Sequence, residues 1–259
     1  MVLALKLPAA QSGTDPERIW TALANGRPND VLRALRGGEG SRAEKLAWAA
    51  ARIGGQPATD DHMRAAESVL AELARGDDEL AAQAAYLRAR IYQVHLSVPD
   101  YARAAELYGE LARRWPGSHW SQQGLVKLAV LKLYVLPDSA APDSDRLAPA
   151  EALLERISEP RLKRDLHLQI GQAGVVLHQP LARFLPHLVA ADRIGGVSGT
   201  AREDLIVQIG VLSERSGLWS QAKDYFERYL AEYPTNVRAF TVKQKLDEAT
   251  RRVAKGSGA

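Results

Sequence analysis

Histidines and paired carboxylates are the residues of this sequence whose types could bind a metal ion or move a proton. No two of the six histidines stand four residues apart, the spacing that lets one helix face grip a metal. His178 and His187 flank the turn at Gln179 and Pro180 and could meet in space, although turn or surface positions explain them more simply. The acidic pairs at 60–61 and 77–78 stand at expected helix starts, where capping accounts for them. We therefore expect no metal site.

The short motifs that mark common enzyme classes are missing from the sequence. It contains neither the G-x-S-x-G of α/β-hydrolases nor the H-E-x-x-H of zinc peptidases. The glycine-rich stretch 195–199 lacks the following lysine and the preceding strand of a phosphate-binding loop. The absence of cysteine excludes disulfides, thiolate chemistry and zinc–thiolate sites. We expect a protein that is not an enzyme and that needs no cofactor.

The composition favours a helical protein with an ordinary hydrophobic core. Of the 259 residues, 46 % are apolar and 25 % charged, and alanine is abundant while runs of valine, isoleucine and threonine are rare. The net charge is +3, with acids and bases mixed along the chain, whereas a nucleic-acid binder usually concentrates its basic residues. Only residues 236–254 approach such a concentration. No stretch approaches the apolar length of a membrane span.

Capping and turn residues divide the chain into expected helices. Ser41 and Glu44 have the spacing of a capping box, and Pro16 follows Asp15 at the first start. Residues 137–145 are rich in proline and aspartate, which predicts a loop. With Asp60 or Asp61 as a further cap, helices are expected at about 15–24, 30–36, 41–53, 60–74, 79–96, 100–115, 118–136, 147–158, 160–178, 180–194, 201–216, 220–233 and 236–254.

Small residues recur where these helices are expected to cross. In the first helix of successive pairs they are Ala47, Ala89, Ala129, Gly171 and Gly210, which stand about 40 residues apart. Two antiparallel helices approach closely where a side chain is small, so the recurrence predicts a stack of similar pairs. The alternative is an irregular helical bundle, because abundant alanine makes a period easy to find.

The segment 203–236 carries the fullest version of the repeat. Gly210 is expected to lie against Phe226 of the following helix, and Pro234 ends that helix. The segment resembles a complete tetratricopeptide repeat, a family with a period of about 34 residues. Ser213 stands where the family usually has an aromatic residue. The matching positions are Ile209, Gly210, Gly217, Trp219, Ala222, Phe226 and Pro234.

The resemblance implies an all-α fold, a right-handed superhelical array of antiparallel helix pairs. In its last helix we expect Phe240, Val242 and Leu246 to pack inward. The expected segments are an extended or disordered arm at 1–14, a repeat domain at 15–255 and a tail at 256–259. Within the repeat domain we expect a cap pair at 15–40, repeats at 41–78, 79–117, 118–159, 160–199 and 200–234, and a capping helix at 235–255.

The resemblance also implies a binding surface, since the first helices of tetratricopeptide pairs line a concave groove that receives a peptide or partner protein. Chaperone-type members clamp a terminal carboxylate with lysine and asparagine, but the matching positions here hold Val207 and Val211, so that kind of capture is not expected. The groove-facing candidates are Arg90, Gln93, Gln123, Lys127, Val130, Gln169, Gln172, Asp204, Gln208 and Val211.

The spacing from Tyr108 to Ser118, repeated from Phe226 to Asn236, is similar to bacterial envelope tetratricopeptide proteins, including the outer-membrane assembly lipoprotein family. This implies a non-catalytic scaffold that binds a protein or peptide in the periplasm or cell envelope. The lipid-bearing cysteine expected at the start of a mature member of that family is missing from this sequence, and the alternatives are an unanchored protein or a trimmed N-terminus. The alternatives are a cytoplasmic protein, a helical accessory domain of an enzyme complex, or a nucleic-acid binder acting through the basic C-terminal helix. A small-molecule ligand is not expected.

Overall fold

The computed structural model describes residues 16–35, 40–136 and 145–256 of the chain. Within these ranges the chain forms thirteen α-helices and one π-helical turn, and no strand. The all-α class predicted from the composition is therefore confirmed. The expected arm at 1–14, the cap Asp15, most of the expected loop at 137–145 and residues 257–259 lie outside the described residues.

The first compact unit of the chain is Met1–Ser121. Its successive helices pack on one another in chain order, and α3 also contacts both α1 and α5. One core cluster joins Ile19 and Val31 to Leu46, Met63 and Leu70. The elements are α1 (Pro16–Ala24), α2 (Pro28–Ala34), α3 (Arg42–Gly54), α4 (Asp60–Leu73), α5 (Glu79–Arg90), the π-helical turn η2 (Ile91–His95) and α6 (Tyr101–Arg114).

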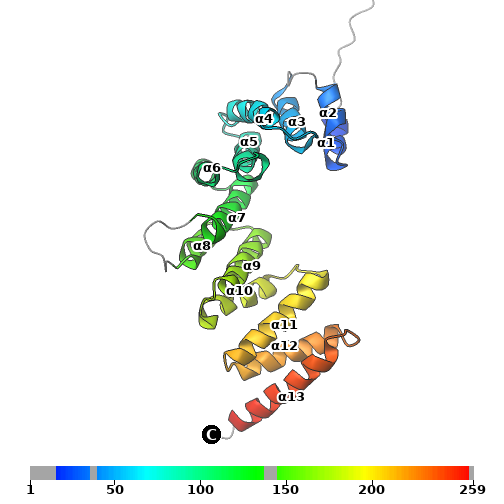
Figure 1. The fold of residues 1–259 in the computed structure, drawn as a ribbon, viewed down its shortest axis with the longest axis vertical. Coiled ribbons are helices and arrows are strands. Elements are labelled where there is room, and N and C mark those ends of the chain that lie inside the picture. The colour runs from blue at the N-terminus through cyan, green and yellow to red at the C-terminus, as the bar shows by residue number, and fades with distance from the viewer. Residues whose placement is uncertain (1–15, 36–39, 137–144, 257–259) are drawn as a thin grey trace, which may run out of the picture. The chain divides into compact units, whose positions relative to one another are not determined.

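The second compact unit is Gln122–Ala259. It holds most of α7 (His119–Tyr134), and from α8 onward each helix packs on the next. Figure 1 shows α11, α12 and α13 side by side at the C-terminal end, in yellow to red. The remaining elements are α8 (Leu147–Leu154), α9 (Pro160–Val176), α10 (Leu181–Ile194), α11 (Gly199–Arg215), α12 (Trp219–Glu232) and α13 (Ala239–Gly256).

Side-chain caps set several helix starts. Ser41 and Glu44 form the predicted capping box on α3, and Asp78 and Asp100 cap α5 and α6. The cap of α4 is Thr59, whose hydroxyl accepts a hydrogen bond from the His62 amide, so the expectation of Asp60 or Asp61 is wrong. Asp60 is occupied elsewhere, because its carboxylate accepts hydrogen bonds from the amide and hydroxyl of Ser97 at 2.9 and 2.7 Å.

Glycines let paired helices approach, as the small-residue pattern predicted. A Cβ placed on Gly210 would lie 2.6 Å from Phe226 Cε1, and Phe226 is fully buried. Gly171 and Gly174 likewise face Leu188 and Phe184 of α10 too closely for a methyl group. These contacts hold α9 against α10 and α11 against α12.

In the segment 203–236, the hydroxyl of Ser213 is buried at the position where the resemblance would place an aromatic residue. Ser213 is fully buried, and its hydroxyl lies 2.7 Å from the carbonyl of Ile209 and 3.2 Å from Gln221 Oε1. The hydroxyl therefore has partners despite its burial, and an unpartnered group there would be costly. Tyr229 fills the neighbouring core with Phe226.

The capping helix α13 differs in one respect from the expectation. Val242 is buried and Leu246 packs against the same core, as predicted, but Phe240 is 71 % exposed and does not pack inward. The helix begins only at Ala239, and the turn before it brings Val242 rather than Phe240 onto the core-facing side.

Polar contacts within each unit repeatedly join residues of one sequence separation. Arg42 pairs with Asp78 in the first unit, across 36 residues. In the second unit the same separation joins Gln122 to Ser158, Glu151 to His187, Gln172 to Gln208, and Asp192 to Arg228. Other polar contacts between helices span different separations, such as 32 residues for Glu151 and Arg183 and 31 for Glu214 and Lys245.

Candidate functional site

Side-chain contacts join successive first helices of the second unit. Gln172 on α9 donates a hydrogen bond from its amide to Gln208 Oε1 on α11 at 3.4 Å. The Tyr134 hydroxyl of α7 lies 3.5 Å from the carbonyl of Gln169 on α9. The structure therefore brings together four positions of one face, three of which were predicted as binding residues. We call the side chains of Tyr134, Gln169, Gln172, Val176 and Gln208 the first-helix face.

The first-helix face is mixed in polarity. Gln172 is exposed and Val176 is 61 % exposed, although sequence reasoning had not included Val176. Val211, predicted for the same surface, instead packs partly against the core of α11–α13. Asp204 is exposed but forms an ion pair with Arg238. The first-helix face thus consists of amide, aliphatic and tyrosine side chains, and none of its five members carries a charge.

The predicted residues of α7 are less accessible. Gln123, Lys127 and Val130 are each half-buried. Their spacing of three and four residues puts them on one side of the helix. They belong to the same unit as the first-helix face.

Arg90 and Gln93 of the first unit are parts of a polar network rather than a free surface. Gln93 is only 7 % exposed, and its Oε1 accepts hydrogen bonds from the Tyr108 hydroxyl at 2.7 Å and from Arg90 Nη1 at 2.9 Å. Burial raises the pKa of Tyr108, although the Arg90 charge opposes this. The Tyr108 hydroxyl therefore stays protonated and links α6 to η2.

Two cavities lie outside the predicted surface. In the first unit a cavity of about 880 Å³ runs between α4, η2 and the start of α6, with Met63, Tyr92 and Val98 among its walls. In the second unit a cavity of about 720 Å³ lies between α10 and the turn that follows α11. Composition and spacing carry no signal for either, because both depend on how loops close over helices.

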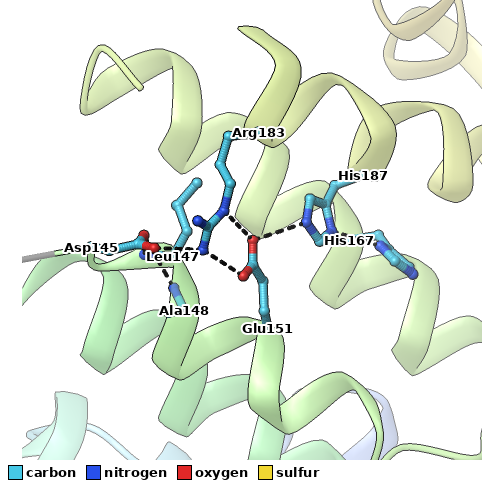
Figure 2. A network of polar contacts seen from close by, with 7 residues as sticks. All are labelled: Asp145, Leu147, Ala148, Glu151, His167, Arg183 and His187. Carbon is cyan, nitrogen blue, oxygen red and sulfur yellow. Dashed lines mark hydrogen bonds and ion pairs between the residues drawn. The ribbon is translucent and has the colours of Figure 1, made fainter. Parts of the chain in front are cut away.

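A polar cluster joins α8, α9 and α10 (Figure 2). Glu151 on α8 accepts two hydrogen bonds from Arg183 on α10, at 3.0 and 2.7 Å. Arg183 also pairs with Asp145 at 2.6 Å, and Asp145 accepts hydrogen bonds from the first amides of α8. Such two-pronged arginine–carboxylate pairing fixes both the charge and the orientation of Glu151.

The same carboxylate orients a pair of imidazole rings. Glu151 Oε1 lies 3.2 Å from His187 Nε2, and His187 Nδ1 lies 3.0 Å from His167 Nδ1 on α9. A carboxylate only accepts, so Nε2 of His187 carries a hydrogen and its Nδ1 in the neutral ring accepts from His167. The facing nitrogens can share one hydrogen but not two. Protonation of both rings would set two N–H groups against each other.

The surroundings keep these rings neutral near neutral pH. Burial, together with the smaller effects of the neighbouring His187 and Lys163, lowers the pKa of His167 to about 4. Burial also lowers the pKa of His187, although Glu151 opposes this by favouring the charged ring. Among the described residues, no group of three or more histidine or carboxylate side chains is arranged to hold a metal ion.

Sequence reasoning considered the wrong partner for His187. The structure places it against His167, while His178 is exposed in the turn with φ of 52°. The missed signal is the position of the turn, since His167 and His187 stand equally far from Leu177, where α9 ends. Residues equidistant from a tight turn between antiparallel helices face each other. Glu151 has no comparable signal, because it belongs to the preceding pair.

Three basic residues of the C-terminal helix form ion pairs. Arg251 and Arg252 both pair with Glu248, and Lys245 pairs with Glu214 of α11. In the described part of the chain, no helix combines the length and the apolar character needed to cross a bilayer.

The amino-acid sequence matches no protein-family model. It matches none of the curated proteins either. What the chain does must therefore be inferred from its own residues.

Proposed function

We propose that this chain is a non-catalytic scaffold of tetratricopeptide type, which binds another protein or a peptide along its first helices. The observation that carries the proposal is the contact between Gln172 and Gln208. It joins exposed or half-buried side chains of two successive first helices, the helices that would line a tetratricopeptide groove. The same 36-residue separation recurs in contacts elsewhere in both units.

The helix crossings support the same assignment. Gly210 lies against Phe226, and Ala222 is fully buried beside them, in the positions that the tetratricopeptide resemblance predicts. A right-handed superhelix of such pairs would present its first helices on the concave side. That arrangement is part of the proposal.

The chemistry of the first-helix face suits a polypeptide partner. The amides of Gln172 and Gln208 each donate and accept, and their mutual hydrogen bond of 3.4 Å is long. A partner backbone would replace it at little cost and satisfy both amides. Val176, which is 61 % exposed, adds an apolar contact that association would remove from water. The resemblance to envelope proteins leads us to propose the periplasm or cell envelope as the compartment.

A photo-crosslinking experiment tests the proposal. A benzophenone amino acid is placed at Gln172 or Gln208 in the full chain, and at Asp224, which is exposed on α12, as a matched control. We expect a discrete adduct with one protein from the first-helix positions and none from position 224. Once that protein is purified, Gln208→Ala and Lys127→Ala should weaken its binding while the circular dichroism spectrum stays unchanged.

Two results would contradict the scaffold. One is the same adduct from all three positions, which would indicate unspecific contact. The other is the absence of any protein adduct together with tight nucleic-acid binding whose affinity falls steeply with salt.

A further inference from the structure

The cavity of the second unit is an apolar groove with a single charged wall residue. One side is α10, which contributes Leu185 and Val189 as an almost fully buried floor. The other side is the turn between α11 and α12, where Leu218 is 48 % exposed at the rim. The volume of about 720 Å³ accommodates several side chains of a peptide. We call this the α10 groove.

The charged residue is Arg193, which is exposed at the end of α10. No carboxylate of the described residues lies within ion-pair distance of its guanidinium, whereas most arginines of the second unit have such a partner. The neighbouring Asp192 is already held by Arg228 at 2.6 Å and by the Tyr225 hydroxyl at 2.9 Å. The positive charge of Arg193 therefore remains uncompensated beside the α10 groove.

A backbone acceptor lies on the same wall. Pro186 stands inside α10, and proline has no amide hydrogen to donate to the carbonyl four residues earlier. That carbonyl belongs to Ala182, and both residues are exposed walls of the groove. The α10 groove thus combines an apolar floor with a cation, and its wall includes Ala182, whose carbonyl lacks the usual helical donor.

We propose that the α10 groove binds a segment of a partner protein in which a large apolar side chain stands next to an acidic one. The apolar side chain would cover Leu185 and Leu218, the carboxylate would pair with Arg193, and a peptide amide would donate to Ala182. This inference rests on the proposed function insofar as the partner is a protein. It adds a second contact surface, formed by the second helix of a pair.

Charge complementarity selects this occupant. A basic segment would meet Arg193 with like charge, and no acidic side chain lines the groove to compensate. A wholly apolar segment would leave the guanidinium beside a surface that removes its water. An acidic neighbour turns the same charge into a hydrogen-bonded pair.

The test uses the full chain and short synthetic peptides with acetylated and amidated ends. One set has a fixed Leu-Glu core, and two matched sets have Leu-Gln and Ala-Glu cores, with the other positions randomised. Fluorescence polarisation at low salt should give the tightest binding for Leu-Glu peptides. Loss of a charged hydrogen bond predicts about tenfold weaker binding for Leu-Gln peptides.

Variants connect the preference to the groove. Arg193→Ala should abolish the difference between Leu-Glu and Leu-Gln peptides, and Leu218→Ser should weaken both. Arg161→Ala is the matched control, since Arg161 is exposed in the same unit but lies outside the groove. It should leave all affinities unchanged.

The proposal is overturned if no peptide set binds, if Leu-Glu and Leu-Gln peptides bind equally, or if Arg161→Ala has the same effect as Arg193→Ala. Crosslinking at Gln172 and Gln208 is independent of these results. If first-helix adducts form but the groove shows no peptide preference, only the proposal for the α10 groove fails. If the groove shows the peptide preference but no first-helix adduct forms, only the proposal for the first-helix face fails.

Discussion

At the scale of single residues, the facing imidazoles of His167 and His187 carry the most specific chemistry of the chain. Their Nδ1 atoms lie 3.0 Å apart, which requires that one nitrogen be without a hydrogen. The charged groups around the pair are Glu151 and Arg183, with Asp145 beyond Arg183 and Lys163 on the His167 side. The contact is thus compatible with neutral rings or with one shared positive charge.

The pair predicts a loss of stability on acidification. The pKa of His167 falls from its ordinary value of 6.5 to about 4 on folding, so the unfolded chain binds this proton more readily. The stabilisation of the folded protein that depends on a neutral His167 ring is fully present above pH 6.5 and is lost as the pH falls from 6.5 toward 4. Since part of the ring remains in water, we expect a loss on the order of 1–2 kcal/mol in the free energy of unfolding. Urea unfolding at a series of pH values measures it.

The control separates this effect from the titration of carboxylates. His167→Gln should show a shallower fall between pH 6.5 and 4 than the parent chain. His178→Asn should follow the parent, because His178 is exposed and asparagine tolerates its positive φ. A parent-like slope in His167→Gln would show that the imidazole pair does not couple to folding.

At the scale of helices, the crossings and several helix ends could be predicted from the sequence, because small residues, prolines and caps act locally. Gly210 against Phe226 and the capping box of Ser41 are as predicted. The wrong cap prediction for α4 has its cause in a contact between residues far apart in the sequence. The Asp60 carboxylate accepts a hydrogen bond from Ser97, and Thr59 caps α4 instead.

Less of the candidate sites could be predicted, because several of their contacts join residues that are far apart in the sequence. The first-helix positions Gln172 and Gln208 follow from the repeat, whereas the partners Glu151 and Asp145 of the histidine cluster depend on the packing of a preceding helix. The α10 groove needs the turn at Leu218 to close over α10. No local pattern encodes such a closure.

A pair of identical substitutions tests the crossing. Gly210→Ala would push a methyl group to within 2.6 Å of the buried Phe226 ring and should destabilise the protein by about 1–3 kcal/mol. Gly109→Ala, in α6, would place its methyl 3.6 Å from the flexible Arg113 side chain and should stabilise by up to about 1 kcal/mol. Thermal denaturation of both variants measures the two signs. Equal effects would show that the crossing at Gly210 is not tightly packed.

At the scale of the whole chain, the contacts divide into two compact units, Met1–Ser121 and Gln122–Ala259. Inside each unit the helices pack mainly on those next to them in the chain. Stability in such an array is a sum of local terms, so damage should stay near its origin.

Hydrogen exchange measures how far damage spreads. Gly210→Ala should accelerate amide exchange in α11, α12 and α13, less in α10, and not in α1–α4. The expected order follows from the packing of α11 on α10 and α12 and of α12 on α13. Uniform acceleration along the whole chain would instead indicate a single cooperative fold.

Four polar pairs of the second unit join residues 36 positions apart, and this has a consequence for how the chain can change length. A tandem copy of a 36-residue block carries one residue for each such position, so between the copies that residue would face its own duplicate. Duplication would therefore set two carboxylates or two guanidinium groups against each other in place of the Asp192–Arg228 pair, and would keep only the Gln172–Gln208 contact, whose amides both donate and accept.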